Sequence, residues 1–181
     1  MNDRGVDGGR LGSPGRVAHV VRETRETRVD LRIDLDAPDP SAPLNTGVPF
    51  FDHMLDALRT HGRLGLSVEA TGDLHVDAHH LVEDTGIALG TALREALVVG
   101  GDGLRIRRYG HAYAPLDESL ARAVVDVCDR PYLYWGVRIS RARVGDFDTD
   151  LCYEFFHALA RNGRLTLHLN LLRGTNSHHE I

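Results

Sequence analysis

Apolar and polar residues alternate along much of this chain, and the alternation is interrupted by two segments with helical spacing. Alternation over residues 17–37 and 63–77 is typical of half-buried antiparallel strands. Apolar residues recur every three to four positions over 50–62 and 79–101, and each segment ends on glycine, so both predict amphipathic helices. The proline-rich stretch 38–49 predicts a turn cluster between the first strands and the first helix.

The second half of the sequence repeats the first. The stretch "FHALARNGRLTLHL" at 156–169 aligns with "LDALRTHGRLGLSV" at 55–68, a constant offset of 101 residues. Residues 107–139 predict further strands, broken at "APLDE" and "CDRPY". We therefore expect an α+β fold with an internal duplication of a four-stranded sheet plus two-helix half-domain, with the helices on one face of the sheet.

The length of 181 residues is typical of one domain. We expect a flexible tail at 1–15, a first half-domain at 16–101 and a second at 102–181, joined into one integrated domain. The net charge of -5 does not indicate a nucleic-acid-binding surface, and no apolar run is long enough to span a membrane. The N-terminus has no apolar signal segment, so we predict a cytoplasmic protein with no nucleic-acid or membrane partner.

The chain contains two cysteines, Cys128 and Cys152, which form no closely spaced motif and are expected to be buried and reduced. All 21 basic residues are arginines, which excludes lysine chemistry from this chain. Eleven histidines are present, and four of them form adjacent pairs.

The histidine pairs have the spacing of metal ligands. His79 and His80 precede Glu83 by four and three residues, so each can share a helical face with this carboxylate. Adjacent histidines diverge by about 100° around a helix, so they serve two neighbouring metals rather than one. Imidazole with carboxylate favours Mn, Fe, Zn or Ni over Mg and Ca. A second pair, His178 and His179, predicts two metal sites with ligands from both halves.

The repeat proposes two further ligands. His53 occupies the position in the first half that Glu154 occupies in the second, again at an offset of 101 residues. Both residue types bind transition metals, and each lies one helix before the histidine pair of its half. Asp84 is expected to orient a histidine or cap the helix rather than bind metal.

The chain resembles the imidazoleglycerol-phosphate dehydratases, lyases of histidine biosynthesis. The matching motifs run in family order from about residue 17: "RETRET", "TGVPFFDHML", "ATGDLHVDAHHLVEDTGIALGTAL", "RRYGHAYAPLDESL", "DRPYL" and "NGRLTLHLNLLRGTNSHH". The resemblance implies dehydration of imidazole glycerol phosphate to imidazole acetol phosphate. It also implies two Mn(2+) ions per active site and a large homo-oligomer, a 24-mer in the family, with active sites at subunit interfaces.

The resemblance assigns roles to individual positions. Glu26 matches a substrate-contacting carboxylate that is a candidate acid or base, and Asp117 and Glu118 are further catalytic candidates. Arg108 and Arg130 match arginines that hold the substrate, since guanidinium binds phosphate in a bidentate manner. The positions that match metal ligands are His53, His79, His80, Glu83, Glu154, His178 and His179. Two metal ions on the imidazole would stabilise an imidazolate, which expels the neighbouring hydroxyl.

The sequence departs from the family pattern at its end. The resemblance implies a glutamate ligand three residues after His179, then a helix and a serine- and lysine-containing tail, whereas Glu180 follows His179 directly and the sequence stops at Ile181. We therefore expect a chain of this length to be poorly stable and weakly active. The alternative function is a catalytically impaired subunit that keeps only metal binding and assembly. A dinuclear metallohydrolase is disfavoured, because the chain has no Asp-rich metal motif.

Overall fold

The computed structural model describes residues 15–98 and 106–181. The expected tail at 1–15 lies outside the described residues except for Gly15, and so does the expected boundary between the half-domains at 101 and 102. The two boundaries therefore stay predictions.

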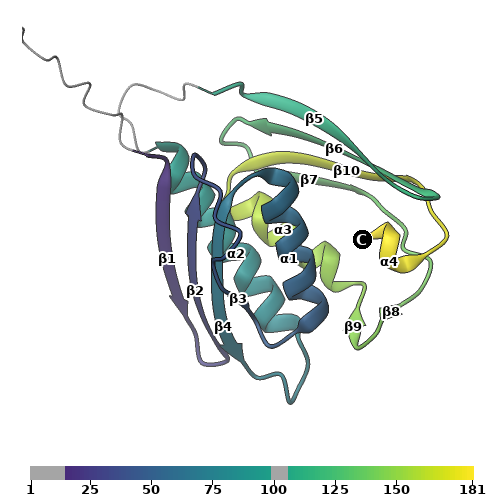
Figure 1. Ribbon diagram of the computed structural model, residues 1–181, viewed down its shortest axis with the longest axis horizontal. Helices are drawn as coiled ribbons and strands as arrows, with labels where there is room; N and C mark the ends of the chain where they lie inside the picture. Colours follow the sequence, from purple (N-terminus) through teal and green to yellow (C-terminus); the bar gives the residue numbers. More distant parts are fainter. Residues whose placement is uncertain (1–14, 99–105) are drawn as a thin grey trace, which may run out of the picture.

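Two four-stranded sheets repeat the same order and directions (Figure 1). In each, an antiparallel hairpin pairs with a third antiparallel strand, and a fourth strand joins it in parallel. The first sheet contains β1 (Val17–Glu23), β2 (Thr27–Asp34), β4 (Gly65–Gly72) and β3 (Leu44–Asn45). The second contains β5 (Tyr109–Leu116), β6 (Ser119–Val127), β10 (Leu165–Arg173) and β7 (Tyr132–Gly136). The predicted duplication is confirmed.

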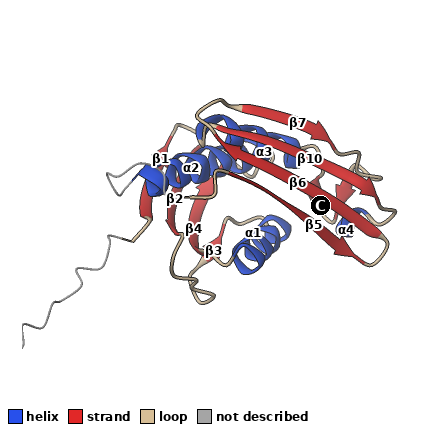
Figure 2. Cartoon of the chain, turned by 90° about the horizontal axis from the view of Figure 1, so that it is seen from above, coloured by secondary structure: helices blue, strands red, loops and turns tan. Residues whose placement is uncertain are grey.

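The helices lie between the two sheets, so each sheet has one covered face and one open face (Figures 1 and 2). The helices are α1 (Pro49–Gly62), α2 (His79–Val98), α3 (Leu151–Asn162) and α4 (Ser177–Glu180). The α+β class and the placement of helices on one face of each sheet are confirmed.

One apolar core is shared by both repeats. Strand β2 contributes Val29, Leu31 and Ile33 from its alternating pattern, and all three are almost inaccessible to solvent. Phe155 and Leu159 of α3 belong to the same cluster. Because each sheet can bury only one face, the paired helices α2 and α3 fill the space between the sheets.

Helices α2 and α3 approach closely at two glycines spaced four residues apart. A Cβ atom on Gly86 would lie 2.6 Å from the carbonyl oxygen of Phe155. A Cβ on Gly90 would lie 2.7 Å from the carbonyl oxygen of Leu159. Both obstacles are backbone atoms, so neither can move aside without separating the helices.

Replacing Gly86 by alanine is expected to destabilise the fold by about 1–3 kcal/mol, although alanine is the better helix former. Urea unfolding of Gly86→Ala measures the change. Gly110→Ala is the matched control, because a Cβ there meets nothing within 4 Å. Equal stability of Gly86→Ala and the wild type would contradict the close packing of α2 on α3.

The structure corrects three details of the sequence-based prediction. The strand expected over 63–77 ends at Gly72, and the alternating Leu74 and Val76 are 38% and 65% exposed in a loop. Strand β3 forms inside the predicted turn cluster, because it pairs with β4 rather than with a neighbour in sequence. The hairpin of β8 (Arg143–Val144) and β9 (Phe147–Asp148) was not predicted.

Cys152 is buried, and burial raises the pKa of its thiol to about 12, whereas Cys128 is only half-buried. The expectation of burial is therefore correct for Cys152 and wrong for Cys128. No helix within residues 15–98 and 106–181 combines the length and apolar character needed to cross a membrane.

Candidate metal centre and active site

Two predicted ligands from opposite halves of the chain lie close together. The rings of His53 in α1 and His178 in α4 have centroids 5.6 Å apart, and both are exposed. The ring of Phe50 packs against both histidines, with its centroid 6.4 Å from that of His53 and 5.4 Å from that of His178. Residues 125 positions apart in sequence (178 minus 53) therefore form one pair of nitrogen donors.

The position of His53 follows from the start of helix α1. Pro49 occupies the first turn, where its missing N–H costs no hydrogen bond. The carboxylate of Asp52 accepts hydrogen bonds from the backbone N–H and the hydroxyl of Thr46, at 2.8 and 2.6 Å. These bonds hold the preceding loop against the helix one residue before His53.

A cavity of about 970 Å³ opens beside this pair and also reaches the first histidine of α2. Both His53 and His79 line it. Its other walls are the loop with Leu74 and Val76 and the β8–β9 hairpin. Because imidazoles from α1 and α2 line this cavity, it is a candidate site for a small ligand beside the predicted metal donors.

Helix α2 presents its histidines in different directions, as predicted. The rings of His79 and His80 are inclined at 81° with centroids 5.8 Å apart. His79 Nε2 lies 3.8 Å from Glu83 Oε2, one turn along the helix. The carboxylate of Asp77 accepts a 2.8 Å hydrogen bond from the backbone N–H of His79 and fixes the start of the helix.

His80 is held by a carboxylate from outside its own helix. Its Nδ1 lies 2.9 Å from Oδ2 of Asp73, in the loop that follows β4. This hydrogen bond is the main cause of a raised pKa at His80, and the negative charge of Glu26 contributes to the same shift. A carboxylate on Nδ1 leaves Nε2 as the donor available to a metal.

The second repeat contains a matching contact. His179 Nδ1 lies 2.9 Å from Oε2 of Glu118, at the turn between β5 and β6. The other oxygen, Oε1, accepts hydrogen bonds from the backbone N–H groups of Thr175 and Asn176, at 3.3 and 2.9 Å. The His179 hydrogen bond is the largest of the contributions that lower the pKa of Glu118 to about 2. Asp117 lies in the same group, whose ligand atoms are all within 4.8 Å of one another.

Helix α4 is short and is fixed by polar contacts to the 137–142 loop. Asn176 caps it by accepting a 3.1 Å hydrogen bond from the backbone N–H of His178. Glu180 is buried and accepts a 2.7 Å hydrogen bond from the backbone N–H of Ser140. Glu180 therefore points into the fold.

Comparisons with known proteins agree on one family. A family model described as imidazoleglycerol-phosphate dehydratase matches residues 46–181. The imidazoleglycerol-phosphate dehydratase of Bordetella petrii is 50% identical over 165 residues, which is 91% of this chain and 83% of that protein. The imidazoleglycerol-phosphate dehydratase of an Azoarcus species is 54% identical over 165 residues, which is also 91% of this chain and 83% of that protein.

Two solved structures share the fold. The crystal structure of the dehydratase from Staphylococcus aureus superposes with a TM-score of 0.77 at 42% identity, covering 91% of this chain and 88% of that one. IGPD from Pyrococcus furiosus gives a TM-score of 0.75 at 37% identity, over 88% of this chain and 83% of that chain. The chain belongs to the imidazoleglycerol-phosphate dehydratase family.

The remaining positions that matched dehydratase motifs lie on other elements than the His53–His178 pair. Arg108 forms a bidentate ion pair with Asp126, at 2.7 and 3.1 Å. Arg130 is exposed between β6 and β7, and Glu154 is half-buried in the first turn of α3. Glu26 is exposed at the turn between β1 and β2.

The structure corrects the role predicted for Asp84 in this dehydratase. Asp84 contacts no histidine among the described residues and instead accepts hydrogen bonds from Arg22 and Thr27. Asp73, which sequence reasoning missed, makes the contact to a histidine. It lies seven residues before His80, outside helical spacing, so only the fold of the β4–α2 loop reveals it.

Proposed function

We infer that this chain is a metal-dependent hydro-lyase that removes water from imidazoleglycerol phosphate in histidine biosynthesis. The observation that carries the proposal is the pairing of His53 and His178 from the two repeats beside the cavity, in a chain of this family. In this proposal both repeats supply metal ligands, which accounts for the two pairs of adjacent histidines in the sequence.

The donor set fits divalent transition metals. The proposed ligands are imidazoles and carboxylates, with no thiolate among them, and several are accessible to solvent. We propose two Mn(2+) ions per active site, held by His53, His79, His80, Glu83, Glu154, His178 and His179. Bound divalent ions supply Lewis acidity toward the imidazole ring of the substrate.

The residues of the chain itself divide the remaining work. Asp73 and Glu118 hold Nδ1 of His80 and His179, so Nε2 of each ring is the nitrogen that we assign to metal binding. With its pKa near 2, Glu118 is an ionised hydrogen-bond acceptor at neutral pH rather than a proton donor. We assign proton transfer at the glycerol carbon to Glu26, with Asp117 as a second candidate.

Arginines are proposed to bind the phosphate. Arg130 is exposed, and its guanidinium offers bidentate donors that match a phosphate. Arg108 has the same chemistry, but its bidentate pair with Asp126 must open or be shared before it contacts the substrate.

We also propose a homo-oligomer of the 24-mer type, with active sites where subunits meet. The open face of the second sheet supports association, because it carries a concentration of exposed aromatic residues. These are Tyr109, Tyr113, Tyr132 and Tyr134. Light scattering of the purified protein measures the assembly, and a monomer at micromolar concentration would contradict it.

The proposed function is tested with the purified chain, Mn(2+) and imidazoleglycerol phosphate. We expect a product lighter than the substrate by one water molecule, identified as imidazole acetol phosphate by mass spectrometry. Mn(2+) binding without any turnover would instead identify a catalytically impaired subunit that keeps metal binding and assembly only.

A further inference from the structure

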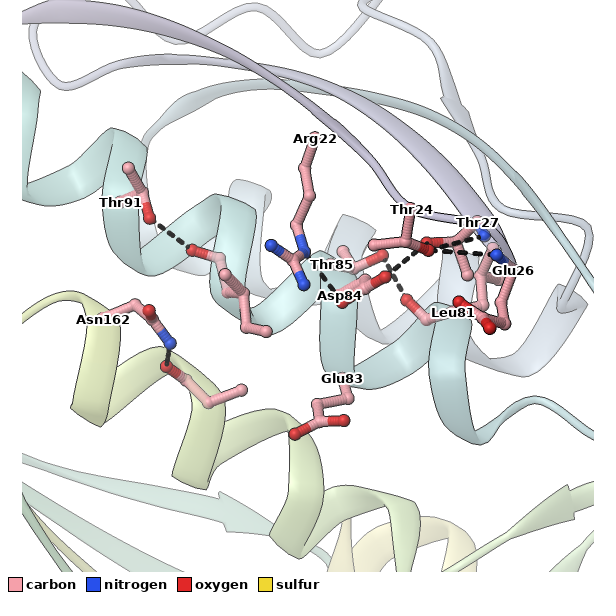
Figure 3. A network of polar contacts seen from close by, with 12 residues as sticks. Arg22, Thr24, Glu26, Thr27, Leu81, Glu83, Asp84, Thr85, Thr91 and Asn162 are labelled. Atoms are coloured by element: carbon pink, nitrogen blue, oxygen red, sulfur yellow. Dashed lines mark hydrogen bonds and ion pairs between the residues drawn. The ribbon is translucent and has the colours of Figure 1, made fainter.

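The "RETRET" motif forms a compact polar network at the turn between β1 and β2 (Figure 3). We call residues 24–27 the hairpin tip. Arg22 lies just before the tip, and Glu26 is the member with an exposed carboxylate. The geometry of this network explains why threonines and an arginine surround the proposed proton-transfer group.

Helix α2 anchors the hairpin tip through Asp84. Its Oδ1 accepts a hydrogen bond from Nε of Arg22 at 2.8 Å, and its Oδ2 accepts a short hydrogen bond from the hydroxyl of Thr27. Asp84 is only 6% exposed. A buried carboxylate is costly unless it is paired, so these two contacts are strongly favoured in the native fold.

The tip is closed on itself by Thr24. The Thr24 hydroxyl oxygen accepts hydrogen bonds from the backbone N–H of Glu26 at 3.1 Å and of Thr27 at 3.0 Å. The backbone N–H of Thr24 donates to the carbonyl of Thr27 at 2.9 Å. The backbone of Glu26 is therefore fixed relative to Thr27, and Thr27 is fixed relative to helix α2.

One turn of helix α2 serves two purposes at once. Glu83, a proposed metal ligand, extends toward α3, whereas its neighbour Asp84 points to the hairpin (Figure 3). His80, another proposed metal ligand, precedes Asp84 by four residues and therefore lies one helical turn from it. Any displacement of the tip would therefore change the placement of Glu26 relative to His80.

We propose that Asp84 is a positioning residue that acts through Thr27 to hold Glu26 in register with the metal-ligand turn of helix α2. This inference rests on the proposed function, because it assigns proton transfer to Glu26. Asp84 itself touches neither substrate nor metal. It determines where the carboxylate of Glu26 lies when substrate binds.

The variants Asp84→Asn and Thr27→Val test this role. Asparagine keeps the volume but presents a donor to either Arg22 or Thr27. Valine removes the hydroxyl that donates to Asp84 and that also lies 3.2 Å from the hydroxyl of Thr24. We expect kcat to fall by about 10- to 100-fold, as for other residues that orient a reacting group, while KM and the affinity for Mn(2+) stay nearly unchanged. Thr27→Ser keeps the hydroxyl and is expected to restore most of the rate.

Two measurements separate positioning from general damage to the fold. Hydrogen exchange of the backbone amides at 24–28 is expected to accelerate in Thr27→Val. Arg28→Gln, which loses only exposed ion pairs with Glu23 and Asp30, serves as the control. In the background of Glu26→Gln, Thr27→Val is expected to cost little further rate, because both changes disable the same group. Unchanged exchange at the tip, or losses in kcat that multiply in the double variant, would overturn the proposal.

The exchange experiment does not depend on the identity of the reaction. If the wild-type chain lacks dehydratase activity, the proposed function fails, and the assigned role of Asp84 in catalysis fails with it. Faster exchange in Thr27→Val would then still establish the anchoring of the hairpin by Asp84.

Discussion

Replacing Glu26 by glutamine is expected to lower kcat by about 100- to 10,000-fold, the range typical of a lost general acid or base. Glutamine preserves the size and the backbone contacts of Glu26 but cannot take up a proton. Because the carboxylate is exposed at the hairpin tip and is not a proposed ligand, Mn(2+) affinity should change little. Steady-state kinetics and isothermal titration with Mn(2+) measure the two effects separately.

Glu23→Gln is the matched control for this substitution. Glu23 lies three residues earlier in the same hairpin, is exposed, and pairs only with Arg28 among the described residues. Its replacement should leave kcat within about twofold of the wild type, since an exposed ion pair contributes little to stability. Parallel losses of turnover and Mn(2+) affinity in Glu26→Gln would assign Glu26 to the metal centre and refute its role in proton transfer.

Removing divalent metal with a chelator is expected to reduce turnover by at least about 1,000-fold, because Lewis-acid stabilisation contributes several kcal/mol to the barrier. Adding Mn(2+) back should restore the rate. His53→Ala should weaken Mn(2+) binding, since it removes one partner of the His53–His178 pair. Electron paramagnetic resonance of free Mn(2+) measures the affinity without reference to activity.

His61→Ala controls for the loss of a histidine from helix α1. His61 lies in the last turn of the same helix and is exposed, so its replacement should leave Mn(2+) affinity unchanged. Full turnover after exhaustive metal removal, checked by elemental analysis, would rule out the metal-dependent mechanism.

The hydrophobic pattern predicted most of the fold because strand and helix periods are local properties of the chain. Alternation in β2 and helical spacing in α2 follow from which face each element buries. The same rule failed at Leu74 and Val76, which alternate like strand residues but line the cavity wall. An alternating pattern does not show whether a neighbouring strand is present to pair with. Here β4 pairs with β2 only as far as Gly72, so the strand ends before Leu74.

Spacing along the chain predicted only those contacts of the candidate site that lie within one helix. The spacing of His79 and Glu83, one helical turn, predicts that their side chains lie close together. In the structure Nε2 of His79 lies 3.8 Å from Oε2 of Glu83. The divergence of His79 from His80 likewise follows from helix geometry. Asp84 has the same kind of helical spacing to His80, yet it binds Arg22 and Thr27, because these donors reach it from β1 and β2.

The sequence by itself determined the duplication, the helices α1 and α2, and the kinds of side chain that the chain offers as proposed metal donors. Only the tertiary structure decided which groups on different elements meet: His53 with His178, Asp73 with His80, and Glu118 with His179. The physical reason is that local periodicity determines which face of an element is buried, whereas contacts between elements depend on how two sheets close over their helices. That packing brings side chains of different elements into contact.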